Sequence, residues 1–130
     1  MADLVIDPTL VEVVSGAPFV YDAVVDIEAG IPCVLDGNTW KKADATALLG
    51  NYGISVNNAY AGQPLSVLTT GVIDLGVAVS QGFLYVVSPT GGIDLISALV
   101  ATNFTNILGY GSDTANQLII KRYNVPLALV

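Results

Sequence analysis

The sequence contains no histidine, a single cysteine, and only 4 basic residues against 11 acidic ones. Without histidine, the Ser-His and Cys-His nucleophile pairs and every histidine metal site are excluded. Cys33 has no intrachain partner for a disulfide, and its apolar neighbours predict a small, buried hydrophobic side chain. No glycine-rich phosphate loop precedes a helix pattern. We therefore expect no enzyme activity, no catalytic residue, no metal and no cofactor.

Basic residues are confined to two doublets, Lys41-Lys42 and Lys121-Arg122, and residues 1–40 hold seven acids and no base. The net charge of −7 repels the phosphate backbone of nucleic acids, whose attraction for basic side chains dominates their affinity for proteins. Neither doublet is large enough to reverse this repulsion. The charge pattern thus predicts a protein that does not bind nucleic acid.

Long apolar runs are also missing, although 53% of the residues are hydrophobic and only 12% are charged. The longest uninterrupted run is Phe83 to Val87, whereas a membrane-spanning helix needs about 20 residues. No basic segment precedes an apolar run at the N-terminus, so we expect neither a secretory signal nor a membrane partner. The excess of apolar groups must be hidden elsewhere, and contact with other protein surfaces is the obvious place.

Alternation of apolar and polar residues is the commonest pattern, and turn residues recur at short intervals. In 19–27 the odd positions are apolar, whereas Asp22 and Asp26 share the other face, which predicts a half-buried strand. The chain should form one domain (1–130), all-β, a compact antiparallel sandwich or barrel resembling a jelly roll, with at most one or two helical turns, at 43–49 and 97–102. The other strands are expected at 10–14, 31–35, 39–42, 53–57, 65–70, 72–75, 83–87, 93–96, 106–110 and 117–122.

Several short motifs occur in one order between residues 28 and 96. They are Asp36-Gly37, Lys42-Ala43-Asp44-Ala45, Gly53-Ile54-x-x-Asn57, Ala61-Gly62-Gln63-Pro64 and Thr70-Gly71-x-Ile73. In this combination the chain resembles the small capsid decoration, or cement, proteins of tailed bacteriophages. The resemblance implies a structural virion protein that is made in the host bacterial cytoplasm and binds the outer surface of an assembled capsid. There it would cement neighbouring major capsid subunits.

Two further expectations concern partners. The protein should form a homo-oligomer, with a dimer favoured over a trimer, because so small a core leaves apolar surface to cover. The preference for a dimer comes from analogy with jelly-roll cement proteins. The alternative function is a carbohydrate- or receptor-binding β module of a phage tail or fibre, in which Trp40 and exposed tyrosines would stack on sugars.

Candidate contact residues follow from aromatic, basic and terminal positions, and each has a second interpretation. Trp40 is either an interface anchor or a core residue, and the basic doublets either meet acidic patches or are simply solvated. Asp74 and Asp94 would suit a glycosidase-type pair, but outward strand positions explain them better. The segments 1–14 and 123–130 are candidate contact arms; the latter either docks on a neighbour or folds back on its own core. The candidate interface residues are Trp40, Lys41, Lys42, Tyr60, Lys121, Arg122, Tyr123, Leu127, Leu129 and Val130.

Overall fold

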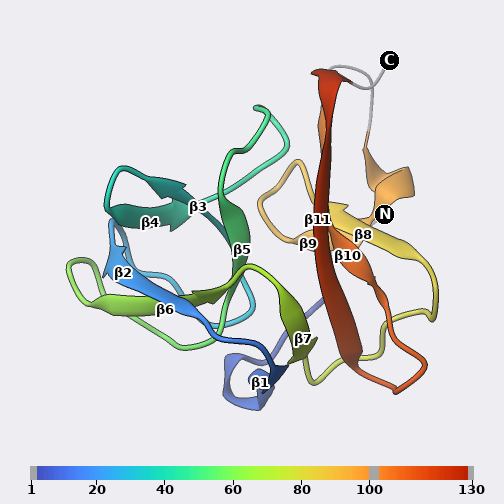
Figure 1. The fold of residues 1–130 in the computed structure, drawn as a ribbon, viewed down its shortest axis with the longest axis horizontal. Coiled ribbons are helices and arrows are strands. Elements are labelled where there is room, and N and C mark those ends of the chain that lie inside the picture. Colours follow the sequence, from blue (N-terminus) through green and yellow to red (C-terminus); the bar gives the residue numbers. More distant parts are fainter. Residues whose placement is uncertain (1–2, 100–102, 129–130) are drawn as a thin grey trace.

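The computed structural model describes residues 3–99 and 103–128, and for 124–128 it describes the backbone alone. These residues form two 3-10 turns and eleven short strands, arranged as a six-stranded sheet beside a closed five-stranded barrel (Figure 1). The elements are η1 (Pro8–Leu10), β1 (Glu12–Ser15), β2 (Phe19–Ala23), β3 (Pro32–Asp36), β4 (Thr39–Lys42), β5 (Tyr52–Ser55), β6 (Pro64–Leu68), β7 (Gly71–Asp74), β8 (Leu84–Val87), β9 (Ile93–Leu95), η2 (Ile96–Ala98), β10 (Phe104–Gly111) and β11 (Gln117–Ala128).

The sheet has the strand order β1-β7-β11-β10-β8-β9, and all its pairings are antiparallel. Its longest strand, β11, changes neighbours along its length. Gln117 pairs with β7, and Leu118 to Ile120 pair with both β7 and β10. Farther along the strand, β10 is the one partner among the described residues. Gly109 is needed on β10 because a Cβ there would lie 1.9 Å from the carbonyl oxygen of Ile119. The absence of a side chain thus lets β10 and β11 approach each other.

The barrel has the cyclic order β2-β4-β3-β5-β6. The hairpin predicted at Asp36-Gly37-Asn38 joins β3 to β4, with Asp36 opposite Thr39 and Gly37 at φ +63°. Glycine adopts positive φ at little cost, which suits this tight turn. Closure depends on β2, which pairs antiparallel with β6 and parallel with β4. The parallel pairing covers just two register pairs, Asp22–Thr39 and Ala23–Trp40.

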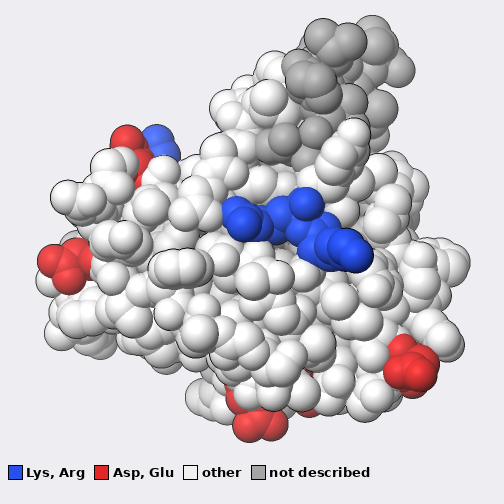
Figure 2. Space-filling view, in the orientation of Figure 1, with Lys and Arg blue, Asp and Glu red and all other residues white. Residues whose placement is uncertain are grey.

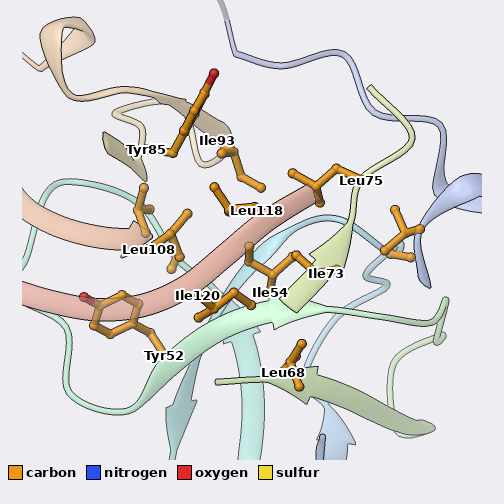
Figure 3. Close-up of a cluster of buried hydrophobic side chains, with 14 of the residues drawn as sticks. Tyr52, Ile54, Leu68, Ile73, Leu75, Tyr85, Ile93, Leu108, Leu118 and Ile120 are labelled. Atoms are coloured by element: carbon orange, nitrogen blue, oxygen red, sulfur yellow. The ribbon is translucent and has the colours of Figure 1, made fainter. Parts of the chain in front are cut away.

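Three groups of buried apolar side chains hold the fold together. The largest lies between the barrel and the sheet, where Ile54 and Leu68 of the barrel meet Ile73, Leu118 and Ile120 of the sheet (Figure 3). A second fills the barrel around Trp40, and a small third packs on the other face of the sheet around Val86. Because the largest core is shared, barrel and sheet bury apolar surface against each other and form one cooperative unit.

The all-β prediction is confirmed, and each predicted strand corresponds to an observed one. Three details were wrong. Residues 43–49 form turns and bends with no helix, whereas the unpredicted turn η1 begins where Asp7 Oδ1 accepts the Thr9 N–H at 3.0 Å. The strand predicted at 19–27 ends at Ala23. Finally, a six-stranded sheet beside a barrel is not the pair of four-stranded sheets of a jelly roll.

Candidate interaction surface

The outer surface of the barrel carries a group of exposed apolar side chains along β2 and the residues that follow it. Phe19 and Val20 expose 52% and 56% of their surface, and Tyr21, Val24 and Val25 are also exposed. Phe19 and Tyr21 alternate with Val20 along the strand, so the exposed side chains project from both of its sides. We call the five residues together the β2 apolar face. Figure 2 shows few charged side chains over this part of the barrel. So many exposed large apolar residues within seven positions are typical of an interaction site.

The interior of the barrel is too small to accept these side chains. Trp40 and Leu65 are fully buried there, and from the β2 region only the small Ala23 and the more distant Ile27 enter the core. Tyr21 reaches the edge of this core, where its ring meets Trp40 edge-to-face at a centroid distance of 6.0 Å. Five strands enclose little volume, so the remaining apolar groups of β2 are left on the surface.

Tyr60 extends the β2 apolar face through the loop that precedes β6. It is 70% exposed, and the loop is tied to the β2 region by bonds from Ala61 N–H to Asp26 Oδ1 and from Gly62 N–H to Ala23 O. A cleft of about 540 Å³ lies beside it. Its polar groups mostly hold their own loops, since Asn58 Oδ1 accepts the Ala29 N–H and Gln63 Oε1 accepts the Tyr60 N–H.

Trp40 is not at an interface, which corrects its place among the candidate contact residues. Its side chain is fully buried at the centre of the barrel. Among the described residues, its indole Nε1 has no hydrogen-bond partner. Of the two interpretations of Trp40, the structure supports the core residue, and it also removes Trp40 from any sugar-stacking platform.

The first basic doublet is split between two environments. Lys41 Nζ lies 3.4 Å from Asp36 Oδ2, an exposed ion pair across the β3–β4 hairpin. Lys42 lines a cleft of about 560 Å³ between the barrel, the N-terminal segment and the β8–β9 turn, together with Asp3, Glu28 and Asp44. Strand alternation explains the split, because consecutive residues of a strand point to opposite sides. The doublet is therefore not one basic patch.

The second basic doublet lies on β11, where Figure 2 shows basic side chains grouped on the face in view. Between the pairs Ile107–Tyr123 and Gly109–Ile120, β11 has two residues, Lys121 and Arg122, where β10 has one. Such a bulge bends a strand and re-aims its side chains. Tyr123 follows, exposed. Lys121, Arg122 and Tyr123, three of the predicted contact residues, are thus neighbours on β11. Tyr60 lies on a different element, the loop that precedes β6.

Arg122 also has a structural role that the sequence did not indicate. Its Nη1 donates to Asn51 Oδ1 at 2.8 Å and to Tyr52 O at 3.3 Å, and its guanidinium lies 5.7 Å from the centre of the Tyr52 ring. Tyr52 OH in turn donates to Ile107 O at 2.7 Å, and burial raises the pKa of this phenol to about 12. Arg122 and Tyr52 together link the sheet to the barrel.

The C-terminal segment continues β11 along β10. Asn124 is opposite Asn106 and Ala128 is opposite Phe104, so four steps on β11 face two on β10, and Pro126 falls within this irregularity. The position suits a residue without an N–H. Within the described part of the chain, β10 is the one strand paired with β11 here, as expected for an edge. Leu127 lies in this stretch, but its side chain, like Leu129 and Val130 altogether, lies outside the described residues. The N-terminal segment likewise contacts its own chain, since Leu4 N–H donates to Ile93 O at 2.8 Å and β1 pairs with β7.

The groups that could carry covalent or acid-base chemistry are separated. Burial raises the pKa of the Cys33 thiol to about 12, and its Sγ lies 3.2 Å from Ile31 O in the barrel core. Asp74 on β7 and Asp94 on β9 are separated by three strands of the sheet, so they do not form a glycosidase-type pair. Within residues 3–99 and 103–128, no three His, Cys, Asp or Glu side chains gather in a way that could hold a metal ion.

Sequence reasoning missed the β2 apolar face because it assumed that every apolar residue at the odd positions of 19–27 pointed into a core. A signal was present nonetheless. Val20 and Val24 occupy the face shared by Asp22 and Asp26, so the alternation is incomplete. Apolar residues on the face expected to be polar are what an interaction surface leaves in a strand pattern.

Comparison with protein families and with curated proteins found no relative of this chain. Among the helical elements of the described residues, none has the length and apolar character required to span a bilayer.

Proposed function

We propose that this protein is a structural virion protein that binds the outer surface of an assembled phage capsid and cements neighbouring major capsid subunits. The observation that carries the proposal is the β2 apolar face. A small acidic domain that keeps these residues in water has a reason to do so if they meet another protein. Burying one such side chain contributes about 1.5–3 kcal/mol before entropy costs, and a shell repeats the contact at every copy.

The motifs between residues 28 and 96 support a phage capsid as the partner in this proposal. They lie mainly in the barrel and in the first strands that leave it, so the part of the chain that resembles decoration proteins adjoins the β2 apolar face. The protein would be made in the bacterial cytoplasm and act on the virion surface. A homo-oligomer, with a dimer favoured over a trimer, forms part of the same proposal, and light scattering of the free protein tests it.

Binding to capsids tests the main proposal. Purified protein is mixed with empty, mature capsids of the phage that encodes it, and bound protein is measured after sedimentation. Saturable binding and a raised melting temperature of the capsid are expected. Val25→Asp should weaken binding by about tenfold or more, because it places a charge in a desolvated contact. Phe83→Asp, a matched change at an exposed apolar residue immediately before β8, should not weaken binding. Absence of binding by the unaltered protein would refute the proposal.

The second candidate function is a sugar- or receptor-binding module, and the cleft beside Tyr60 is the observation that favours it. An exposed tyrosine next to Glu28 and Asn58 has the aromatic and polar groups that sugars need. Because several polar atoms there already bind the loops, this candidate ranks second. A glycan array decides it: binding that disappears in Tyr60→Ala, without any capsid binding, would replace the first proposal by the second.

A further inference from the structure

The β2 strand has a free edge at its N-terminal half. On one side, Phe19, Val20 and Tyr21 pair with Val67, Ser66 and Leu65 of β6. On the other side, the pairing with β4 begins only at Asp22, opposite Thr39. Among the described residues, Phe19, Val20 and Tyr21 therefore have a strand beside them on one side alone. An exposed apolar strand edge is a template on which another chain can add a strand.

The direction of the backbone groups at this edge follows from the neighbouring hydrogen bonds. Ser66 directs its N–H and C=O toward the residues that follow β5, since its N–H donates to Asn57 Oδ1 at 2.7 Å and its carbonyl accepts the Val56 N–H at 2.9 Å. Val20 and Ser66 are therefore a non-hydrogen-bonded pair of the β2–β6 ladder. The N–H and C=O of Val20 point away from β6, to the free edge.

Two bonds farther along β2 confirm this alternation. Ala23 N–H donates to Gln63 O on the β6 side, whereas Val24 N–H donates to Trp40 O on the β4 side. Even-numbered residues thus direct their backbone groups away from β6. β4 occupies that side only from Asp22 onward, so Val20 is left with an outward N–H and C=O. Its side chain is exposed as well.

Charge identifies the kind of segment that fits this edge. Asp22 is exposed next to Val20 along the strand, on the same face, and residues 1–40 include no base. The nearest cation on the neighbouring hairpin, Lys41, is already paired with Asp36. A second copy that paired through its own β2 edge would bring the same acidic segment, which contains no complementary cation. The complement is an extended apolar segment with basic flanks from a different protein.

We propose that the free edge of β2 at Val20 binds an extended, apolar segment of a partner protein by strand addition, with a basic residue of that segment meeting Asp22. The inference deepens the proposed function, on which it rests for the identity of the partner as a capsid subunit. Main-chain bonds to Val20 would provide part of the affinity, and Phe19, Tyr21 and Val24 would contact alternate side chains of the added strand.

A peptide probe tests the edge independently of any capsid. The probe is a short peptide of alternating valine and threonine with two lysines at each end, and its control has glutamates in place of the lysines. Binding is followed by fluorescence anisotropy, and the Val20 amide by nuclear magnetic resonance. We expect the lysine peptide to bind, the glutamate peptide to bind about tenfold more weakly, and the Val20 amide to become protected.

Two variants separate the backbone contribution from the side chain. Val20→Pro removes the outward N–H and leaves the β6 ladder intact, whereas Val20→Thr keeps the N–H and the branched shape. Val20→Pro should weaken binding of the lysine peptide about fivefold to tenfold more than Val20→Thr does. Thermal melting shows whether each variant is folded; if Val20→Pro is not, Asp22→Lys replaces it and should abolish the preference for the lysine peptide.

The outcomes that overturn the inference differ from those that overturn the proposed function. Absence of peptide binding, equal binding of both peptides, or equal effects of proline and threonine would refute strand addition. A dimer that Val20→Pro dissociates would assign the edge to a second copy instead. If capsids bind Val20→Pro as well as the unaltered protein, the capsid function stands and the edge plays no part in it. If the peptide binds but capsids do not, the edge stands and the capsid function fails.

Discussion

The barrel and the sheet differ in how completely their apolar side chains are buried. The sheet has apolar cores on both of its faces, one shared with the barrel and one around Val86. The barrel has one narrow interior, filled by Trp40 and a few smaller side chains, and leaves the β2 apolar face in water. The sheet has both faces covered by neighbouring segments, whereas the barrel is covered by the sheet on one side and leaves the side along β2 exposed. The exposed apolar residues of the barrel therefore gather along β2 and the residues that follow it.

The largest expected effect of a single change is in the barrel core. Trp40→Ala should lower the free energy of unfolding by about 3–5 kcal/mol, because no other side chain can fill the space of the indole. Ile120→Ala in the shared core should cost about 2–5 kcal/mol. Urea unfolding followed by far-ultraviolet circular dichroism measures both. Tyr60→Ala, at an exposed position, is the control and should change little.

The same measurement tests whether barrel and sheet unfold together. Trp40 is the only tryptophan, so in the unaltered protein its fluorescence reports on the barrel, while circular dichroism reports on all strands. Coincident transitions are expected because the largest core is shared. Separate transitions would show that barrel and sheet are independent units.

The next largest loss of folding stability is expected from a change in the sheet. Gly109→Ala should cost about 1–3 kcal/mol or more, since the added methyl group must displace the backbone of β11 at Ile119. Gly50→Ala is the matched control, because no atom lies within 4 Å of a Cβ at that position. Comparison of their denaturation midpoints checks the prediction. Equal midpoints would mean that β10 and β11 are not in close contact.

The junction between barrel and sheet should be sensitive to alkaline pH. Burial raises the pKa of Tyr52 to about 12 from the ordinary tyrosine value of 10.0, so the folded state holds this proton more tightly than the unfolded state does. The resulting stability is complete below pH 10 and is lost as the pH rises through about 12. Tyr52→Phe should cost about 0.5–1.5 kcal/mol at pH 7, for the bond to Ile107, and should reduce the loss between pH 10 and 12.

Cys33 titrates in an overlapping range, because burial also raises its pKa to about 12. The comparison is therefore made in a Cys33→Ala background, with Tyr60→Phe as the control for an exposed phenol. An unchanged alkaline slope in Tyr52→Phe would contradict the assignment to Tyr52.

The smallest effect is expected for Arg122, which bridges the two parts at their surface. Arg122→Ala should cost about 0.2–1 kcal/mol, since an exposed cation gains little from its partners in water. Lys121→Ala, which leaves the bonds to Asn51 and Tyr52 in place, should cost less. Thermal melting at low and high salt measures both. A larger effect for Lys121 would show that the bridge at Arg122 is unimportant.

Local pattern was enough to place the strands. Apolar alternation with glycine and proline turns located β3, β4 and the hairpin between them, because a turn such as Asp36-Gly37-Asn38 acts over a few residues. It also indicated Cys33 as a buried side chain. These features depend on backbone conformation and neighbouring residues, which a sequence contains directly.

The tertiary structure alone decided which apolar residues became core and which became surface. Trp40 and Phe19 are both aromatic strand residues, yet one fills the barrel and the other remains half in water. The choice depends on how five strands close and how little volume they enclose, and on β4 beginning too late along β2 to cover Val20. The register that leaves this edge free, and the bulge that groups Lys121 with Arg122, are set by pairing between distant segments, which no local pattern specifies.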